Sequence, residues 1–154
     1  MDRVSRTLRA ADMSRYASAF ASRAAVKTRL PLDFSAASLR IVDRVVDGLR
    51  QGAGDPADVA PILQELGSYV GEVFVRQARA RWVDFDGMTS ELLQQPVGVR
   101  TPDGRAWNPL GKVANRFELG PDESAYELFL LVPRRPKDLP LSRGTAAGRR
   151  LTAA

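Results

Sequence analysis

Apolar side chains in the first part of the chain recur at three- and four-residue spacing, which predicts an amphipathic helix. Over residues 13–28 this stripe includes Met13, Phe20 and Ala24, and basic side chains flank it. Pro31 then keeps the residue before it out of the helical conformation, so an extended link follows. We expect the helix to pack on the rest of the fold; the alternative is a basic amphipathic segment that contacts a membrane surface or a partner.

A second stretch of helical spacing runs from Leu39 to Leu49. Ser35 precedes it and is a good N-cap, because its hydroxyl accepts hydrogen bonds from the free amides of the first turn. Phe34 and Leu39 have the spacing of a hydrophobic staple, which fixes how the chain enters a helix. Gly52 is expected to end the helix in the left-handed conformation, which glycine adopts at little cost.

A third, longer helix follows and starts near Asp58 or, alternatively, at Asp55. With the later start, Pro61 lies in the first turn, where no backbone donor is needed. Gly67 and Gly71 lie four residues apart within this helix, where each glycine costs about 1 kcal/mol relative to alanine. Two such glycines predict that another backbone approaches closely there.

The chemistry then changes to that of strands. Residues 81–86 are rich in strand formers, and residues 96–100 and 105–108 flank the turn sequence Thr-Pro-Asp-Gly at 101–104. We expect a hairpin with a third strand beside it. Residues 88–95 form a connector or a short helical turn.

Asn108 followed by Pro109 predicts a helix start, because asparagine caps the free amides and proline has none to satisfy. This helix is expected to end at Gly120, and a last helix covers residues 123–132. The chain is therefore predicted to be an α+β protein, with four to five helices packed on a small antiparallel sheet of about three strands.

Charge divides the chain into three segments. Residues 1–30 carry seven basic and two acidic groups, residues 31–132 carry ten and fifteen, and residues 133–154 carry six and one. We expect a basic N-terminal helical arm, a compact acidic α+β domain and a basic C-terminal tail, which lacks apolar periodicity and is disordered. Nucleic acid or an acidic membrane surface would then bind through the arms alone.

Composition excludes several classes of function. The 154 residues include no cysteine and no histidine. Disulfides, cysteine or imidazole metal sites and histidine-based catalytic triads are therefore excluded, and no cofactor is predicted. No apolar run approaches the ~20 residues of a membrane helix, and we expect a cytoplasmic protein. These features favour a binding protein over an enzyme.

Arg105, Lys112 and Arg116 are a candidate anion-binding site. They lie before and within the helix that starts at Pro109, and the free amides of a helix N-terminus together with basic side chains can hold an anion. The alternative, which we favour, is that these cations form ion pairs with carboxylates over residues 118–123.

Asp84 and Asp86 fall on one side of the strand predicted at 81–86. Two carboxylates at this spacing are weak candidates for a divalent metal site. A solvated strand face is the preferred interpretation, because no partner motif accompanies them.

Glu72, Trp82 and Trp107 are candidates for a pocket or groove. Glu72 lies among apolar residues and could act as an acid or base, although an ion pair with Arg76 is the simpler explanation. The two tryptophans could line a ligand groove or stack on bases. On strands that face several helices, tryptophans are more often part of the core.

Residues 32–132 resemble an uncharacterised bacterial domain family, a domain of unknown function. The resemblance rests on Leu32-Asp33-Phe34-Ser35, on Gly67-Ser68-Tyr69-Val70-Gly71-Glu72, on Arg81-Trp82-Val83 and on Asn108-Pro109 with the helix that follows. Membership of this family would imply a compact α+β domain with no established activity.

Three functional hypotheses follow. The first is a non-catalytic binding or interaction domain of the bacterial cytoplasm, with another protein as its partner. The second is a small carboxylate-dependent enzyme, or a phosphoester- or anion-binding protein, that uses Asp84, Asp86 or Glu72. The third is an immunity-type or regulatory protein that pairs with another gene product.

Overall fold

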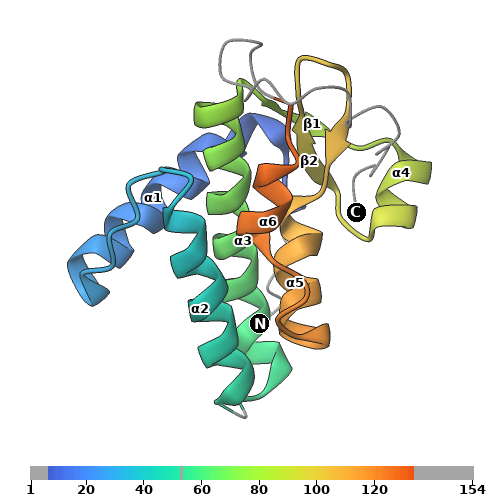
Figure 1. Ribbon diagram of the computed structural model, residues 1–154. Coiled ribbons are helices and arrows are strands. Elements are labelled where there is room, and N and C mark those ends of the chain that lie inside the picture. Colours follow the sequence, from blue (N-terminus) through green and yellow to red (C-terminus); the bar gives the residue numbers. More distant parts are fainter. Residues whose placement is uncertain (1–6, 53, 134–154) are drawn as a thin grey trace.

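A computed structural model describes residues 7–52 and 54–133 of the chain. In these ranges α2, α3 and α5 lie side by side, and the sheet lies across one end of α3 and α5 (Figure 1). The elements in order are α1 (Ala10–Thr28), α2 (Ser38–Gln51), α3 (Pro56–Ala78), β1 (Arg81–Asp84), α4 (Gly87–Leu93), β2 (Val97–Arg100), β3 (Ala106–Trp107), α5 (Pro109–Leu119) and α6 (Ala125–Leu130). The predicted α+β class is confirmed, and one more helix than expected is present because the connector over 88–95 forms α4.

The N-terminal helix packs on the body, as the preferred interpretation predicted. α1 crosses α3 and contacts β1, and its inner face buries Met13, Ala17 and Ala21. The amide of Ala10 donates a hydrogen bond to Asp84 Oδ1 at 2.8 Å, so a strand residue satisfies a free donor at the start of this helix. α1 therefore belongs to the same packed unit as the predicted compact domain.

The start and end of α2 differ in detail from the prediction. The hydroxyl of Ser35 accepts from the amide of Ser38 at 3.2 Å, so Ser35 caps a tight turn that leads into the helix. Phe34 has φ 61° and stacks its ring on Tyr69, with 4.8 Å between ring centroids. The left-handed ending at Gly52 was wrong, because Gly52 has φ −73° and its amide stays bonded to the preceding turn.

The earlier of the two predicted starts of α3 is confirmed. The helix begins at Pro56, and Asp55 Oδ1 accepts from the amide of Ala57 at 2.9 Å. Pro61 consequently lies inside the helix rather than in its first turn. The cap matters here because it satisfies one of the free amides of the helix that contacts both α1 and α5.

The two glycines of α3 meet different neighbours. A Cβ on Gly67 would lie 2.8 Å from Leu110 Cα, so the predicted close approach of another backbone is confirmed there. A Cβ on Gly71 would lie 2.1 Å from the ring of Trp82, so this glycine makes room for a side chain instead. Both positions are filled by neighbouring elements, which leaves no space for larger residues.

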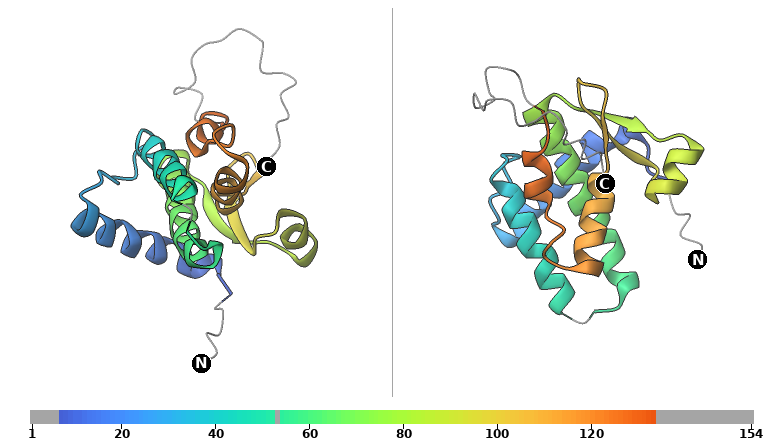
Figure 2. Two further views of the ribbon diagram at one scale, coloured as in Figure 1. Left: turned by 90° about the horizontal axis from the view of Figure 1, so that it is seen from below. Right: turned by 45° about the vertical axis from the view of Figure 1, so that its right-hand side comes forward.

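The sheet is antiparallel and has three strands, as predicted, and their order is β1-β2-β3. Its register pairs Trp82 with Val99 and Val99 with Trp107. The turn before β3 contains Gly104 at φ 91°, a conformation that favours glycine. α4 follows β1 and lies at the edge of the molecule in both views of Figure 2; Met88 and Leu92 on it are 82% and 80% exposed.

The predicted start and end of α5 are confirmed. Asn108 Oδ1 accepts from the amide of Gly111 at 3.0 Å, and Gly120 follows the helix at φ 105°. The start of α6 is capped by Ser124, whose hydroxyl accepts from the amide of Glu127 at 3.1 Å. α5 and α6 thereby place their inner faces against α2, α3 and the sheet.

Aromatic rings fill the centre between the helices and the sheet. Phe74 meets Trp107 edge to face, with centroids 6.2 Å apart, and meets Phe129 at 5.4 Å. In the part of the chain that the structure describes, none of the helices has the length and apolarity required to cross a bilayer. The predicted tail over 133–154 lies outside the described residues except for Pro133.

Candidate functional site

The three cations of the predicted anion site do not converge on a common point. Arg105 lies 3.3 Å from Asp103 in the hairpin turn, and Lys112 donates to Glu123 at 2.7 Å. Arg116 is buried against α2 instead. Each cation therefore has a protein carboxylate as its partner. The favoured alternative, pairing with Glu118, Asp122 or Glu123, is confirmed for Lys112. It was wrong for Arg105 and Arg116, whose partners are Asp103 and Asp47.

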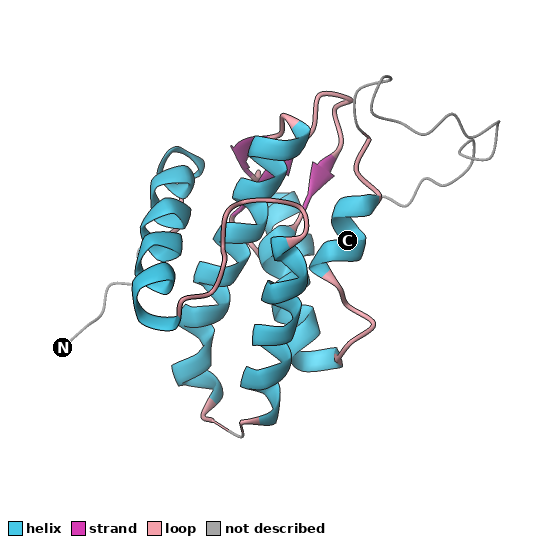
Figure 3. Cartoon of the chain, turned by 60° about the vertical axis from the view of Figure 1, so that its left-hand side comes forward, coloured by secondary structure: helices cyan, strands magenta, loops and turns pink. Residues whose placement is uncertain are grey.

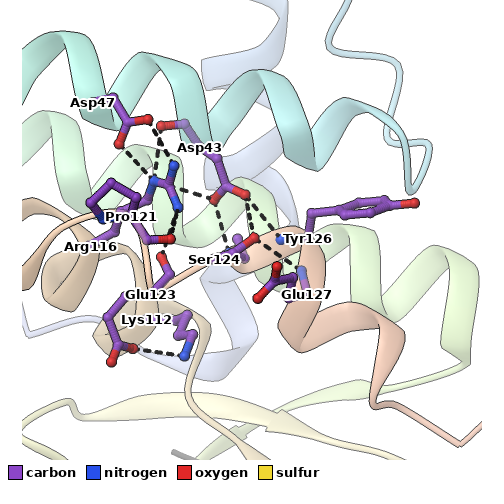
Figure 4. Close-up of polar contacts among 10 residues, drawn as sticks. Asp43, Asp47, Lys112, Arg116, Pro121, Glu123, Ser124, Tyr126 and Glu127 are labelled. Atoms are coloured by element: carbon purple, nitrogen blue, oxygen red, sulfur yellow. Dashed lines mark hydrogen bonds and ion pairs between the residues drawn. The ribbon is translucent and has the colours of Figure 1, made fainter.

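Arg116 connects α5 to α2 and to the segment before α6 (Figure 4). Its guanidinium donates to both carboxylate oxygens of Asp47 at 2.8 Å and to the carbonyl of Pro121 at 2.9 Å. Burial alone would lower the pKa of Arg116, but the hydrogen bonds to Asp47 and the charges of Asp43 and Asp47 outweigh it and raise the pKa. Arg116 is therefore a permanently charged structural link.

Asp43 completes this network from α2. Its carboxylate accepts from the hydroxyl of Ser124 at 2.6 Å and from the amide of Ala125 at 2.9 Å, so α2 caps the N-terminus of α6. Figure 4 shows these groups facing one another. We therefore assign the network to the stability of the fold rather than to ligand binding.

Glu72 is only 2% exposed and contacts α1. Its Oε1 accepts from the hydroxyl of Ser14 at 2.8 Å. The predicted ion pair with Arg76 was wrong, because Arg76 instead donates to Ser18 at 3.3 Å and lies 3.7 Å above the ring of Phe34. Glu72 and Arg76 of α3 thus hold α1 in place.

The two tryptophans also have structural roles. Trp107 is fully buried, and its Nε1 donates to Thr101 Oγ1 at 2.9 Å. The ring of Trp82 covers Gly71, and among the described residues its buried Nε1 has no hydrogen-bond partner. Trp107 is therefore a core residue, as the sequence favours for a tryptophan on a strand that faces several helices.

The two aspartates are each engaged by a backbone amide. Asp84 accepts from Ala10 at 2.8 Å, and Asp86 caps α4 by accepting from the amide of Thr89 at 2.7 Å. This hydrogen bond lowers the pKa of Asp86. Among residues 7–52 and 54–133, acidic side chains nowhere form a group of three or more that could hold a metal ion.

An apolar groove lies in a different place, between α1, α2 and α3. Its volume is about 360 Å³. In the left view of Figure 2 the C-terminal half of α1 extends beyond α2 and α3, and Figure 3 shows the loop that returns from the end of α1 to the start of α2. The groove occupies the angle between this half of α1 and the other two helices.

Apolar side chains form the walls and floor of the groove, and its charged side chains lie at the rim. One face of α1 lines it at helical spacing, with Phe20, Arg23, Ala24, Lys27 and Thr28. Val42 from α2 and Leu66 from α3 form a buried floor, and Ile62 at the edge is 37% exposed. The arrangement is therefore suited to an apolar group that enters beside a charged rim.

Two basic side chains of α1 reach this rim. Arg23 forms an ion pair with Glu65 of α3, which neutralises the guanidinium. Lys27 also lines the groove, and within the described ranges its ammonium group has neither an ion pair nor a hydrogen bond. The rim thus presents one ammonium group without a partner.

The sequence placed Phe20 and Ala24 in the apolar stripe of this helix and basic residues beside it, but it did not predict a groove. The floor comes from α2 and α3, at Val42 and Leu66, and only the tertiary packing brings these residues to α1. The available signal was the alternation of apolar and basic positions over 20–27. That pattern is equally typical of a solvated helix face.

Comparison with protein-family models, with curated proteins and with solved structures finds no match to this chain. The resemblance of residues 32–132 to an uncharacterised bacterial domain family therefore stays a prediction.

Proposed function

We propose that this chain is a non-catalytic binding domain whose ligand lies in the groove between α1, α2 and α3. The lining carries this proposal, because side chains from three helices form an apolar floor and walls with charge confined to the rim. Ligand sites are typically apolar concavities of roughly 300–1,000 Å³ with a few polar groups that orient the ligand. The groove, at about 360 Å³, falls within this range.

Binding accounts for the polar side chains better than catalysis does. The carboxylates that an enzyme would need, Asp84, Asp86 and Glu72, already accept hydrogen bonds from Ala10, Thr89 and Ser14 respectively. A ligand in the groove would meet one carboxylate, that of Glu65, which faces Arg23. The bacterial cytoplasm remains the proposed location, and a protein partner stays a prediction for other surfaces, such as the exposed face of α4.

The test uses the full chain and N-phenyl-1-naphthylamine, a neutral dye whose fluorescence rises in apolar surroundings. We expect a saturable rise in fluorescence with the unmodified protein. The variant Ala24→Trp should weaken binding at least tenfold, about 1.4 kcal/mol, because the indole would occupy the groove that Ala24 lines.

Two matched variants control for binding elsewhere. Ala25→Trp makes the same substitution at the next position of α1, which is exposed and lies outside the groove lining. Leu92→Ser removes the exposed apolar side chain of α4. Both variants should bind the dye as the unmodified protein does, and circular dichroism should show the same helix content in all of them. Equal losses in Ala24→Trp and Ala25→Trp, a loss confined to Leu92→Ser, or no saturable binding at all would contradict the proposal.

A further inference from the structure

We infer that the ligand of this groove is a small amphipathic anion, that is, an apolar chain or ring system that carries one negative group such as a carboxylate and pairs it with Lys27. The inference rests on the proposed function and adds the chemical class of the ligand. Its basis is the position of one lysine at the rim of an otherwise apolar groove.

Lys27 is placed to receive an anion. It follows Arg23 by one helical turn on the face of α1 that lines the groove, and Thr28 ends the same face. Among the described residues its ammonium contacts no carboxylate and no hydrogen-bond acceptor. A lysine in the last turn also interacts favourably with the helix dipole, and this purely structural role is the one that an experiment has to separate from ligand binding.

The charges around Lys27 favour a ligand with a single negative charge. Of the charged groups that line the groove, α1 contributes Arg23 and Lys27, and α3 contributes Glu65. Because Glu65 already neutralises Arg23, the rim has a net charge of one positive unit. A monoanion matches this single positive charge, whereas a dianion would leave one of its charges without a cation among the residues that line the groove.

The remainder of the ligand has to be apolar. Phe20, Val45 and Leu66 line the same groove as Lys27, and burial of apolar surface is the main driving force for binding there. Inorganic phosphate would leave these side chains in contact with water. The volume of about 360 Å³ fits a free small molecule, and we commit to that source rather than to a lipid held in a membrane.

The experiment compares octanoate with 1-heptanol, two probes with the same seven-carbon alkyl chain and different charge, at pH 7.5 with the full chain. Each probe displaces the neutral dye, and the displacement gives its affinity. We expect octanoate to bind roughly threefold to fivefold more tightly than 1-heptanol at low salt, the range of a partly exposed ion pair. This preference should shrink as salt is added, because salt screens exposed charges.

Lys27→Gln retains much of the side-chain length and removes the charge. It should abolish the preference for octanoate and leave the affinity for 1-heptanol unchanged. Arg44→Gln is the matched control, because it removes a charge from an exposed position of α2 outside the groove, and the preference should persist in it. A structural role of Lys27 alone would lower the stability of Lys27→Gln without changing the ratio of the two affinities.

Several results would overturn the inference. Equal binding of the two probes by the unmodified protein, or equal loss of preference in Lys27→Gln and Arg44→Gln, would refute the anionic ligand and leave the proposed function intact. Displacement of the dye by inorganic phosphate, or binding to vesicles of anionic phospholipid in preference to octanoate, would refute a free amphipathic monoanion. Failure of both probes and of the dye to bind would refute the proposed function as well.

Discussion

Arg116 holds together parts of the chain that are far apart in the sequence. Its partners on α2 precede it by 69 residues at Asp47 and by 73 at Asp43, and Pro121 follows it. An ion pair of this kind is costly to form, because both ions lose water, and it is costlier still to break from one side. Arg116 should therefore contribute strongly to stability although it is not near the groove.

Replacing Arg116 with methionine tests this contribution. We expect Arg116→Met to lower the free energy of unfolding by about 3 kcal/mol, because Asp47 and the carbonyl of Pro121 lose their donor while the apolar volume is retained. Urea unfolding measures the change. Arg15→Met is the control, since Arg15 and Asp12 form an exposed pair; it should change stability by less than about 0.5 kcal/mol, and similar losses in both variants would contradict the assignment.

Two helical glycines should respond to replacement by alanine with opposite changes in the stability of the fold. Gly67→Ala would bring a Cβ to 2.8 Å from Leu110 Cα, and this overpacking should destabilise the fold by about 1–3 kcal/mol. A Cβ on Gly48 of α2 would meet nothing within 4 Å, so Gly48→Ala should stabilise it by about 0.5–1 kcal/mol. Thermal unfolding distinguishes the two, and a neutral Gly67→Ala would show that α3 and α5 can move apart freely.

At the scale of elements, the two halves of α1 have different roles. The N-terminal half, here called the docked half, packs on α3, and the C-terminal half, the extended half, reaches beyond α2 and α3 (Figure 2). Small and polar residues hold the docked half, where Ser14 donates to Glu72 of α3 and Ser18 accepts from Arg76 of the same helix. The extended half forms one wall of the groove. Any movement of α1 would therefore change the groove.

Met13→Ala tests whether α1 unfolds together with the rest. Met13 is fully buried and packs with Val97 and Leu110, so its truncation should cost about 2–5 kcal/mol. We expect the midpoint of urea unfolding to fall for the whole molecule, and amide exchange in α1 and α3 to accelerate together. If exchange rises in α1 alone while the midpoint stays, α1 is instead an independently unfolding segment.

Local signals predicted most element boundaries but not the contacts between elements. The cap at Asn108 and the alternative start at Asp55 depend on residues within one turn, so both could be predicted from the sequence. The partner of Glu72 could not be found this way, because Ser14 lies 58 residues away and outcompetes the sequence neighbour Arg76. The groove was missed for the same reason, since its walls and floor come from separate helices.

At the scale of the whole molecule, the docking of α1 changes the distribution of charge. Residues 31–132 alone carry ten basic and fifteen acidic groups. Residues 7–52 and 54–133, which include α1, carry fifteen basic and sixteen acidic groups and are close to neutral. Residues 134–154 carry six basic groups and one acidic group, so most of the excess positive charge of the chain belongs to that segment.

This distribution predicts where polyanions bind. The full chain should be retained on heparin at low salt. A chain that ends at Pro133 should elute at much lower salt, because its basic groups no longer outnumber its acidic groups and few of them are free to bind sulfate. Only the C-terminal segment can be deleted in this test, since removal of residues 1–30 would take Met13 and Ala17 out of the core. Equal retention of both chains would place the polyanion contact on the folded body.

The hydrogen bond between Ala10 and Asp84 also has a consequence for synthesis on the ribosome. The two residues are 74 positions apart, which at about 5–20 residues per second corresponds to a delay of roughly 4 to 15 s. During that interval the nascent chain presents the apolar side of α1 without its cap or its docking surface. Chaperones that hold exposed apolar helices, and the proteases that compete with them, would therefore encounter this protein at its N-terminus first.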